Sequence, residues 1–201
     1  MIEVITLSHT ASYASNSYLV CSENECAVID PSLPYYSGVL RGNKLRYIIL
    51  THGHFDHFLE IDSWVKSTGA PVLISNCDKS ALSDPFRNCY RMFLGADRGY
   101  FGECVSIEDG DSLLIGDEPM RVMACPGHTP GSITLLADDV AFVGDTVFAG
   151  GAYGRYDLPG GDVASLADSI KKICKLPEDT VVYPGHGEVT TIKEINKHFR
   201  L

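Results

Sequence analysis

Three of the seven histidines and one aspartate lie close together in a short segment of the chain. The segment reads Thr51-His52-Gly53-His54-Phe55-Asp56-His57. Neutral imidazoles and a carboxylate that converge in a small volume bind divalent metals such as zinc, and also manganese or iron. His52 and His54 alternate in a loop and so face one point, whereas Asp56 and His57 begin the following helix and face a neighbouring point. The spacing therefore favours two metals over one.

Three further loops each place one ligand-type side chain directly after an apolar, strand-like run. They are Pro126-Gly127-His128-Thr129-Pro130-Gly131-Ser132, Val143-Gly144-Asp145-Thr146 and Tyr183-Pro184-Gly185-His186-Gly187. Glycines beside His128, Asp145 and His186 allow tight turns and a close approach of the backbone to a metal. A single loop residue of this type is usually solvated, but three such loops beside the histidine cluster indicate metal ligands.

The elements that must position these residues are strands and helices in a recurring order. Apolar periodicity predicts strands at 4–7, 17–21, 27–30, 45–51, 72–75, 113–115, 120–124, 133–137, 140–143 and 180–183, and helices at 56–68, 162–175 and from 191. Two strand-then-helix blocks thus flank a β-rich middle. We expect an α/β fold in which two mixed sheets pack together with the helices outside, in four layers.

The stretch 83–104 interrupts this order. It mixes Pro85, Gly95 and other breakers with aromatic residues such as Phe93 and Tyr100, so it is irregular yet too aromatic for a solvated linker. We expect it to form a flap over the site.

Length and composition limit the function classes. The 201 residues predict a single domain, 1–201, and the net charge of −10 argues against a nucleic-acid or anionic-membrane partner. No apolar run is long enough for a membrane span, and the N-terminus lacks the basic start of a signal peptide. We therefore expect a cytoplasmic protein that acts on a small molecule, either as a monomer or as a homo-oligomer.

The cysteines give a similar indication about the compartment. There are seven, they are scattered, and no two form a C-x-x-C pair. This pattern fits a reducing compartment better than a disulfide framework, so we interpret most of them as small buried apolar residues.

The order of the motifs T-H-x-H-x-D-H, P-G-H-T-P-G-S, G-D and P-G-H-G resembles that of the metallo-β-lactamase superfamily over nearly the whole chain. The resemblance implies the αβ/βα sandwich of that superfamily. It also implies a role for each motif residue: His52, His54 and His128 hold the first metal, Asp56, His57 and His186 hold the second, and Asp145 bridges them. Asp145 stands where many true β-lactamases have cysteine, which argues against antibiotic hydrolysis.

The resemblance implies a binuclear hydrolase with two divalent ions, zinc in the first place and iron or manganese as alternatives. Two such ions about 3.5–4 Å apart share a bridging hydroxide and polarise the carbonyl that it attacks. Asp56 is the expected catalytic residue, because it can orient that hydroxide or accept its proton.

The segment Tyr153-Gly154-Arg155-Tyr156-Asp157-Leu158-Pro159-Gly160-Gly161-Asp162 resembles one found in glyoxalase II-like hydrolases, which cleave thioesters of the hydroxyacylglutathione type. It makes Arg155 and Tyr153 candidate substrate contacts, although Arg155 can equally pair with Asp157 and brace the loop. Full-length glyoxalase II enzymes carry an additional helical domain that binds glutathione, whereas 15 residues follow His186 here. We therefore expect a single-domain thioesterase or related esterase, and the sequence does not identify the thiol carrier of its substrate.

Two alternatives share the fold. A persulfide dioxygenase has a similar G-R-x-D segment and uses one iron, held by residues that match His52, His54, His128 and Asp145. Spacing does not separate it from the hydrolase, because a second set of ligands can be present without being filled. A lactonase is the weaker alternative.

Overall fold

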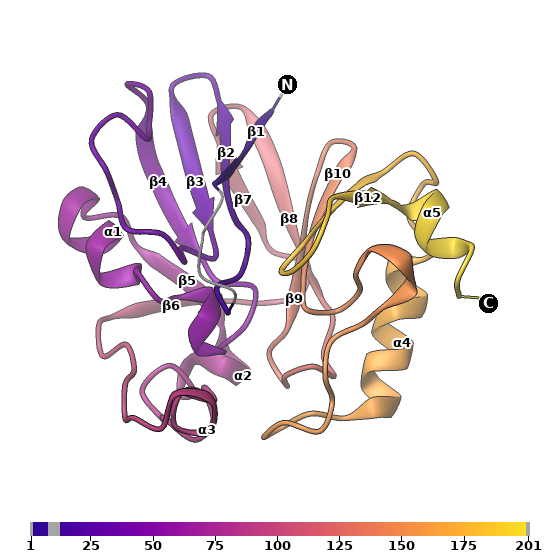
Figure 1. The fold of residues 1–201 in the computed structure, drawn as a ribbon. Coiled ribbons are helices and arrows are strands. Elements are labelled where there is room, and N and C mark those ends of the chain that lie inside the picture. The colour runs from indigo at the N-terminus through magenta and orange to yellow at the C-terminus, as the bar shows by residue number, and fades with distance from the viewer. Residues whose placement is uncertain (1, 8–12, 200–201) are drawn as a thin grey trace.

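The computed structural model describes residues 2–7 and 13–199, which form two six-stranded sheets (Figure 1). The first sheet has the order β1-β2-β3-β4-β5-β6, with the bounds Glu3–Leu7, Ser17–Ser22, Glu25–Ile29, Lys44–Ile49, Val72–Ser75 and Cys104–Ile107. The second has the order β12-β11-β10-β9-β8-β7, with the bounds, from β7 to β12, Ser112–Ile115, Glu118–Ala124, Ile133–Ala137, Val140–Gly144, Val181–Pro184 and Thr190–Thr191. Both sheets contain parallel and antiparallel pairs, so both are mixed.

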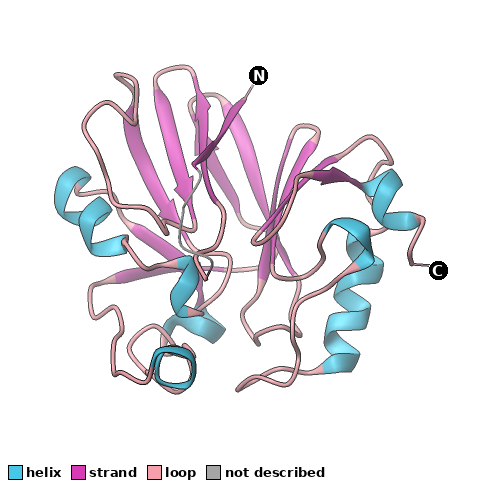
Figure 2. Cartoon of the chain, viewed as in Figure 1, coloured by secondary structure: helices cyan, strands magenta, loops and turns pink. Residues whose placement is uncertain are grey.

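Three apolar layers hold the sheets and helices together. Side chains alternate between the two faces of β2, so this strand contributes to two of the layers. Tyr18 and Val20 face the second sheet, while Leu19 and Cys21 face outward. The outer side of the first sheet packs on Trp64 of α1 (Ile61–Thr68). The outer side of the second sheet packs on α4 (Val163–Ile173) and α5 (Ile192–Asn196). The order helix, sheet, sheet, helix confirms the predicted four-layer sandwich (Figure 2).

The predicted strands and helices mostly match, with exceptions at the histidine cluster, in and after the 83–104 stretch, and at the short strand β12, which was not predicted. The helix expected over 56–68 is a 3₁₀ turn at Phe55–His57 followed by α1, so Asp56 and His57 precede the α-helix. The stretch 83–104 contains the short helix α3 (Tyr90–Leu94), and its last residue begins the unpredicted strand β6. A second short helix, α2 (Asn76–Lys79), follows β5.

The expectation about the cysteines was wrong for one pair. Cys21 and Cys26 form a disulfide between β2 and β3. The tight turn between these strands makes the two residues direct cross-strand partners, with their Cα atoms 4.1 Å apart. A spacing of five residues gives no disulfide signal until the hairpin register is known. The other five cysteines are free.

None of the helices within 2–7 and 13–199 is both long enough and apolar enough to cross a membrane.

Candidate metal centre

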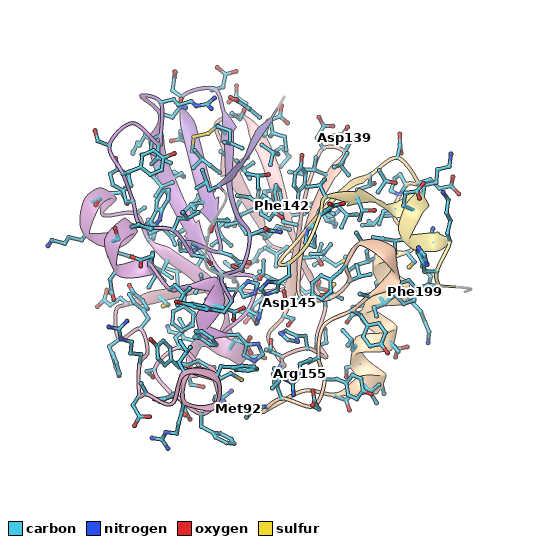
Figure 3. All side chains as sticks on the ribbon, in the orientation of Figure 1. Met92, Asp139, Phe142, Asp145, Arg155 and Phe199 are labelled. Carbon is cyan, nitrogen blue, oxygen red and sulfur yellow. A yellow bond between two sulfur atoms is a disulfide. The ribbon has the colours of Figure 1, made fainter. Side chains whose placement is uncertain are left out.

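All seven predicted ligands meet where strand ends of both sheets face each other. The loop after β4 supplies His52, His54, Asp56 and His57, and the loops after β8, β10 and β11 supply His128, Asp145 and His186. Figure 3 shows Asp145 near the middle of the molecule, between the two halves, with Arg155 beyond it. Residues separated by up to 134 positions in the sequence thus share one site.

The ligand atoms fall into three overlapping groups, each with its atoms within 4.8 Å of one another. The groups are His52, His54 and His128; His52, His57 and Asp145; and Asp56, His57 and His186. We call the first the inner group and the last the outer group. The second group connects them, because it shares one histidine with each.

Asp145 lies between the inner and outer groups. Its Oδ2 is 3.6 Å from Nε2 of His128 and 3.6 Å from Nε2 of His186, and its Oδ1 is 3.4 Å from Nε2 of His57. Oδ2 thus lies near a histidine of each group, and Oδ1 lies near a histidine of the outer group, so this carboxylate can bridge two cations.

Several buried polar atoms of the cluster have no hydrogen-bond partner among the described residues. They are Nε2 of His52, His54 and His57, and Oδ1 of Asp145. Nδ1 of His54 and Nε2 of His128 lie 2.9 Å apart, so these nitrogens also converge. Buried polar atoms are normally paired, and a metal would satisfy a set made of imidazole nitrogens and carboxylate oxygens. The donor set therefore fits divalent metal ions.

Two histidines of the inner group, His52 and His54, favour the neutral imidazole. Burial, together with the neighbouring histidines, places the pKa of His52 well below its usual range. Burial and His128 lower the pKa of His54 to about 3. A neutral ring offers a lone pair, which is the form that binds a metal.

The outer group and Asp145 are more strongly charged. Burial opposes the charge on His57, but Asp30, Asp145 and Asp56 raise its pKa well above the usual range. Burial likewise opposes the charges on Asp145 and Asp56, yet His57 lowers the pKa of both carboxyls. The pKa of His186 is raised against burial by its hydrogen bond to Asp56, with 3.1 Å between Nε2 and Oδ2. Both carboxylates are thus ionised and available to cations.

Asp30 is a positioning residue that the sequence analysis missed. It is buried at the end of β3, where its Oδ2 lies 2.8 Å from Nδ1 of His57. Its two oxygens also accept from the backbone N–H and the hydroxyl of Thr51. This contact makes Nδ1 of His57 the donor and turns Nε2 toward the site. In the sequence, Asp30 only marks the end of a strand.

Asp78 is a second missed residue and acts on two loops. Its buried carboxylate in α2 accepts from the backbone N–H groups of Gly53 and Gly131, at 2.9 Å each, and from the Thr129 hydroxyl at 2.6 Å. Gly53 sits between His52 and His54, and Thr129 follows His128. Asp78 therefore fixes the two loops of the inner group against each other, without touching a ligand.

The close approaches explain two glycines of the motifs. Gly144 has a φ of 51°, and a Cβ there would meet the Thr51 side chain at 2.6 Å. A Cβ at Gly185 would collide with Oδ1 of Asp145 and Cε1 of His57. Both residues let the two sheets bring their ligands together.

Arg155 and Tyr153 lie on the rim of the site. The Arg155 guanidinium forms a bidentate pair with Asp157, at 2.8 and 2.7 Å. Its backbone carbonyl accepts from Nδ1 of His128 at 2.6 Å. Arg155 therefore positions a ligand through its main chain, a contact that the sequence did not indicate.

A cavity of about 510 Å³ opens above the cluster. Its base contains His54, Asp56, His128, Asp145 and His186. Its walls include Tyr153 and Arg155, and the 83–104 stretch contributes Cys89, Phe93 and Leu94. The stretch thus forms part of the wall of the cavity, and its role as a flap stays a prediction.

Comparison with known proteins gives a consistent result. The family model of the metallo-beta-lactamase superfamily matches residues 12–186. A probable metallo-hydrolase, YqgX of Bacillus subtilis, is 32% identical over 192 residues, covering 89% of this chain and 87% of the relative.

Solved structures are similar over almost the whole chain. The BLEG-1 B3 metallo-beta-lactamase has a TM-score of 0.88 and 31% identity, covering 98% of this chain and 97% of that one. A di-iron-bound form of TTHA1623 has a TM-score of 0.80 and 30% identity, covering 96% of each chain. ETHE1 from Myxococcus xanthus has a TM-score of 0.73 and 26% identity, covering 98% of this chain and 82% of that one. The chain belongs to the metallo-beta-lactamase superfamily of metal-dependent hydrolases.

Proposed function

We propose that the protein is a binuclear metallohydrolase that cleaves a thioester or a related small ester. The observation that carries this proposal is the position of Asp145, with carboxylate oxygens 3.4–3.6 Å from histidines of both groups. The inner group would hold one ion and the outer group the other. Two ions held in this way lower the pKa of a bound water and polarise the substrate carbonyl.

Asp56 is the group of the chain best placed to move a proton. Its carboxylate is ionised, its side chain is 16% exposed to solvent, and it lines the cavity. It can therefore accept the proton of the attacking water and deliver it to the leaving thiolate or alkoxide. The hydrogen bond from His186 keeps Asp56 oriented toward the cavity.

The cavity offers no activated nucleophile of its own among the described residues. Cys89 lines it, but burial and the nearby Asp56 raise the pKa of this thiol to about 11. A thiol that stays protonated near neutral pH is a poor nucleophile. Attack by water is therefore favoured over a covalent intermediate.

Zinc is the first proposal for the metal, because the histidine-rich donor set suits it. The same set suits iron and manganese, and the di-iron form of TTHA1623 supports iron as the alternative.

Metal content and substrate turnover, measured together on protein purified without chelator, test the proposal. We expect two ions per chain and hydrolysis of thioesters such as lactoyl-glutathione or acetyl-N-acetylcysteamine. One iron per chain with oxygen uptake on glutathione persulfide would instead identify a dioxygenase. A lactone and a cephalosporin complete the panel, the latter because BLEG-1 bears the name of a β-lactamase.

A further inference from the structure

The cavity wall is apolar and exposed. Phe93 is 51% exposed to solvent and Tyr153 is 49% exposed, although both line the cavity above the metal ligands. Leu94, Phe148 and Leu158 continue the wall. Large apolar side chains gathered at a cavity mouth are costly in water and typically contact a ligand.

The wall also provides little positive charge. Outside the ligand histidines, Arg155 is the one cationic side chain among the described residues that line the cavity. Its guanidinium is engaged by both oxygens of Asp157, and it lies 5.8 Å from the Phe93 ring centroid. Asp157 thus occupies the Nε and Nη2 edge of the guanidinium, so a substrate carboxylate would have to compete with it for bidentate pairing. The net charge of −10 on the chain adds repulsion toward anions.

We propose that this site selects neutral thioesters or esters whose non-reacting part is apolar, and discriminates against anionic thiol carriers such as glutathione, which bears two carboxylates. The inference rests on the proposed function and specifies its substrate class. The walls formed by Phe93 and Tyr153 accommodate an acyl or aromatic chain, while the metal-ligand base receives the carbonyl.

Two matched thioester series test the selectivity. N-acetylcysteamine thioesters are neutral and glutathione thioesters are anionic, and each series can carry acetyl, butanoyl, hexanoyl and octanoyl groups. We expect kcat/KM to be at least about tenfold higher for the neutral hexanoyl thioester than for hexanoyl-glutathione. Along the neutral series, kcat/KM should rise by up to about fourfold per methylene. Equal or higher kcat/KM for glutathione thioesters, with no dependence on chain length, would overturn the inference while leaving the hydrolase proposal intact.

Phe93→Ala and Phe86→Ala form a matched pair of variants. Both phenylalanines are more than half exposed in the 83–104 stretch, but only Phe93 lines the cavity. We expect Phe93→Ala to flatten the dependence of kcat/KM on acyl-chain length, and Phe86→Ala to keep the chain-length dependence of the wild type. Equal effects of both substitutions, at unchanged melting temperature, would contradict the assigned wall.

Asp157→Asn tests the charge argument in the opposite direction. Without its carboxylate partner, Arg155 can engage an anionic substrate, so we expect KM for glutathione thioesters to fall several-fold and KM for neutral thioesters to stay unchanged. An unchanged KM for both series would contradict the proposal that the Arg155–Asp157 pair limits binding of anionic substrates.

Binding separates this inference from the proposed reaction. S-octyl-N-acetylcysteamine and S-octylglutathione are thioethers that cannot be hydrolysed, and calorimetry measures their affinities directly. We expect the neutral thioether to bind at least about tenfold more tightly, and Phe93→Ala to weaken it. Tight neutral binding without turnover of any thioester would refute only the reaction, whereas tighter binding of S-octylglutathione would refute the inference.

Discussion

The inner and outer ligand groups differ in solvent access. His52, His54 and His128 are all buried. In the outer group His57 is buried, but the side chains of Asp56 and His186 keep 16% and 35% of their exposed area. A ligand that reaches solvent can leave its metal more readily than one enclosed by the protein.

The residues that support the two groups differ as well. Asp78 joins the loops of the inner group through backbone N–H groups and one hydroxyl, so it fixes a distance between loops. Asp30 contacts His57 directly, so it fixes the orientation of one ring in the outer group. The comparison indicates a rigid inner site and an outer site that depends on single side chains.

Loss of the carboxylate that lies between the inner and outer groups should have the largest effect. Asp145→Ala removes the carboxylate between them, and we expect fewer than two metals per chain and a fall in kcat of about 10²–10³-fold or more. Asp139→Ala is the matched control, because Asp139 lies in an exposed turn far from the site (Figure 3). Two retained metals and full turnover in the Asp145 variant would argue against the bridging position.

Single-ligand variants should separate the groups. We expect His186→Ala to keep one metal per chain after dialysis, because the inner group is intact. We expect His54→Ala to lose the inner metal and to weaken the outer one through the shared Asp145. Elemental analysis of both dialysed proteins measures this, and identical metal content in the two variants would contradict the difference between the groups.

Substitution of the supporting aspartates should give a smaller and graded effect. We expect Asp30→Asn to weaken metal affinity about 10–100-fold, as is usual for a residue that orients a ligand. The loss should affect the affinity for the outer ion. Competition with a chromophoric chelator measures this, because the two ions are removed in two separate steps. Unchanged affinity would show that packing alone holds His57.

Asp78→Asn should act chiefly on the inner ion and on stability. The amide keeps one acceptor for three donors, so we expect the free energy of unfolding of the metal-free protein to fall by about 2–3 kcal/mol. Denaturant titration measures it. A loss confined to the outer ion would reverse the assignment of Asp30 and Asp78.

The smallest expected effect concerns thiol reactivity beside the outer group. Because burial raises the pKa of Cys89 to about 11, about one thiol in a thousand is ionised at pH 8. We expect iodoacetamide to modify the exposed Cys77 well before Cys89, with the rate at Cys89 still rising between pH 8 and pH 10. Peptide mass spectrometry follows both sites, and rapid modification of Cys89 at pH 7 would contradict the buried thiol.

The sequence was sufficient to predict the sandwich and to select seven side chains that the structure brings together, since ligand chemistry restricts both residue types and spacing. His52, His54, Asp56 and His57 stand in one segment, and glycines accompany the remaining three. Asp30 and Asp78 could not be found in this way, because a single aspartate has no periodicity and its hydrogen bonds depend on tertiary placement. The Cys21–Cys26 pair required a hairpin register, and β6 is too short and too exposed for a clear pattern.

The central claim is that the two groups hold two ions for thioester hydrolysis. The most direct test is metal content per chain, measured with thioester turnover and persulfide-dependent oxygen uptake on the same chelator-free preparation. The account predicts close to two ions per chain, hydrolysis of a thioester and no oxygen uptake. A single iron with oxygen consumption on glutathione persulfide would contradict it.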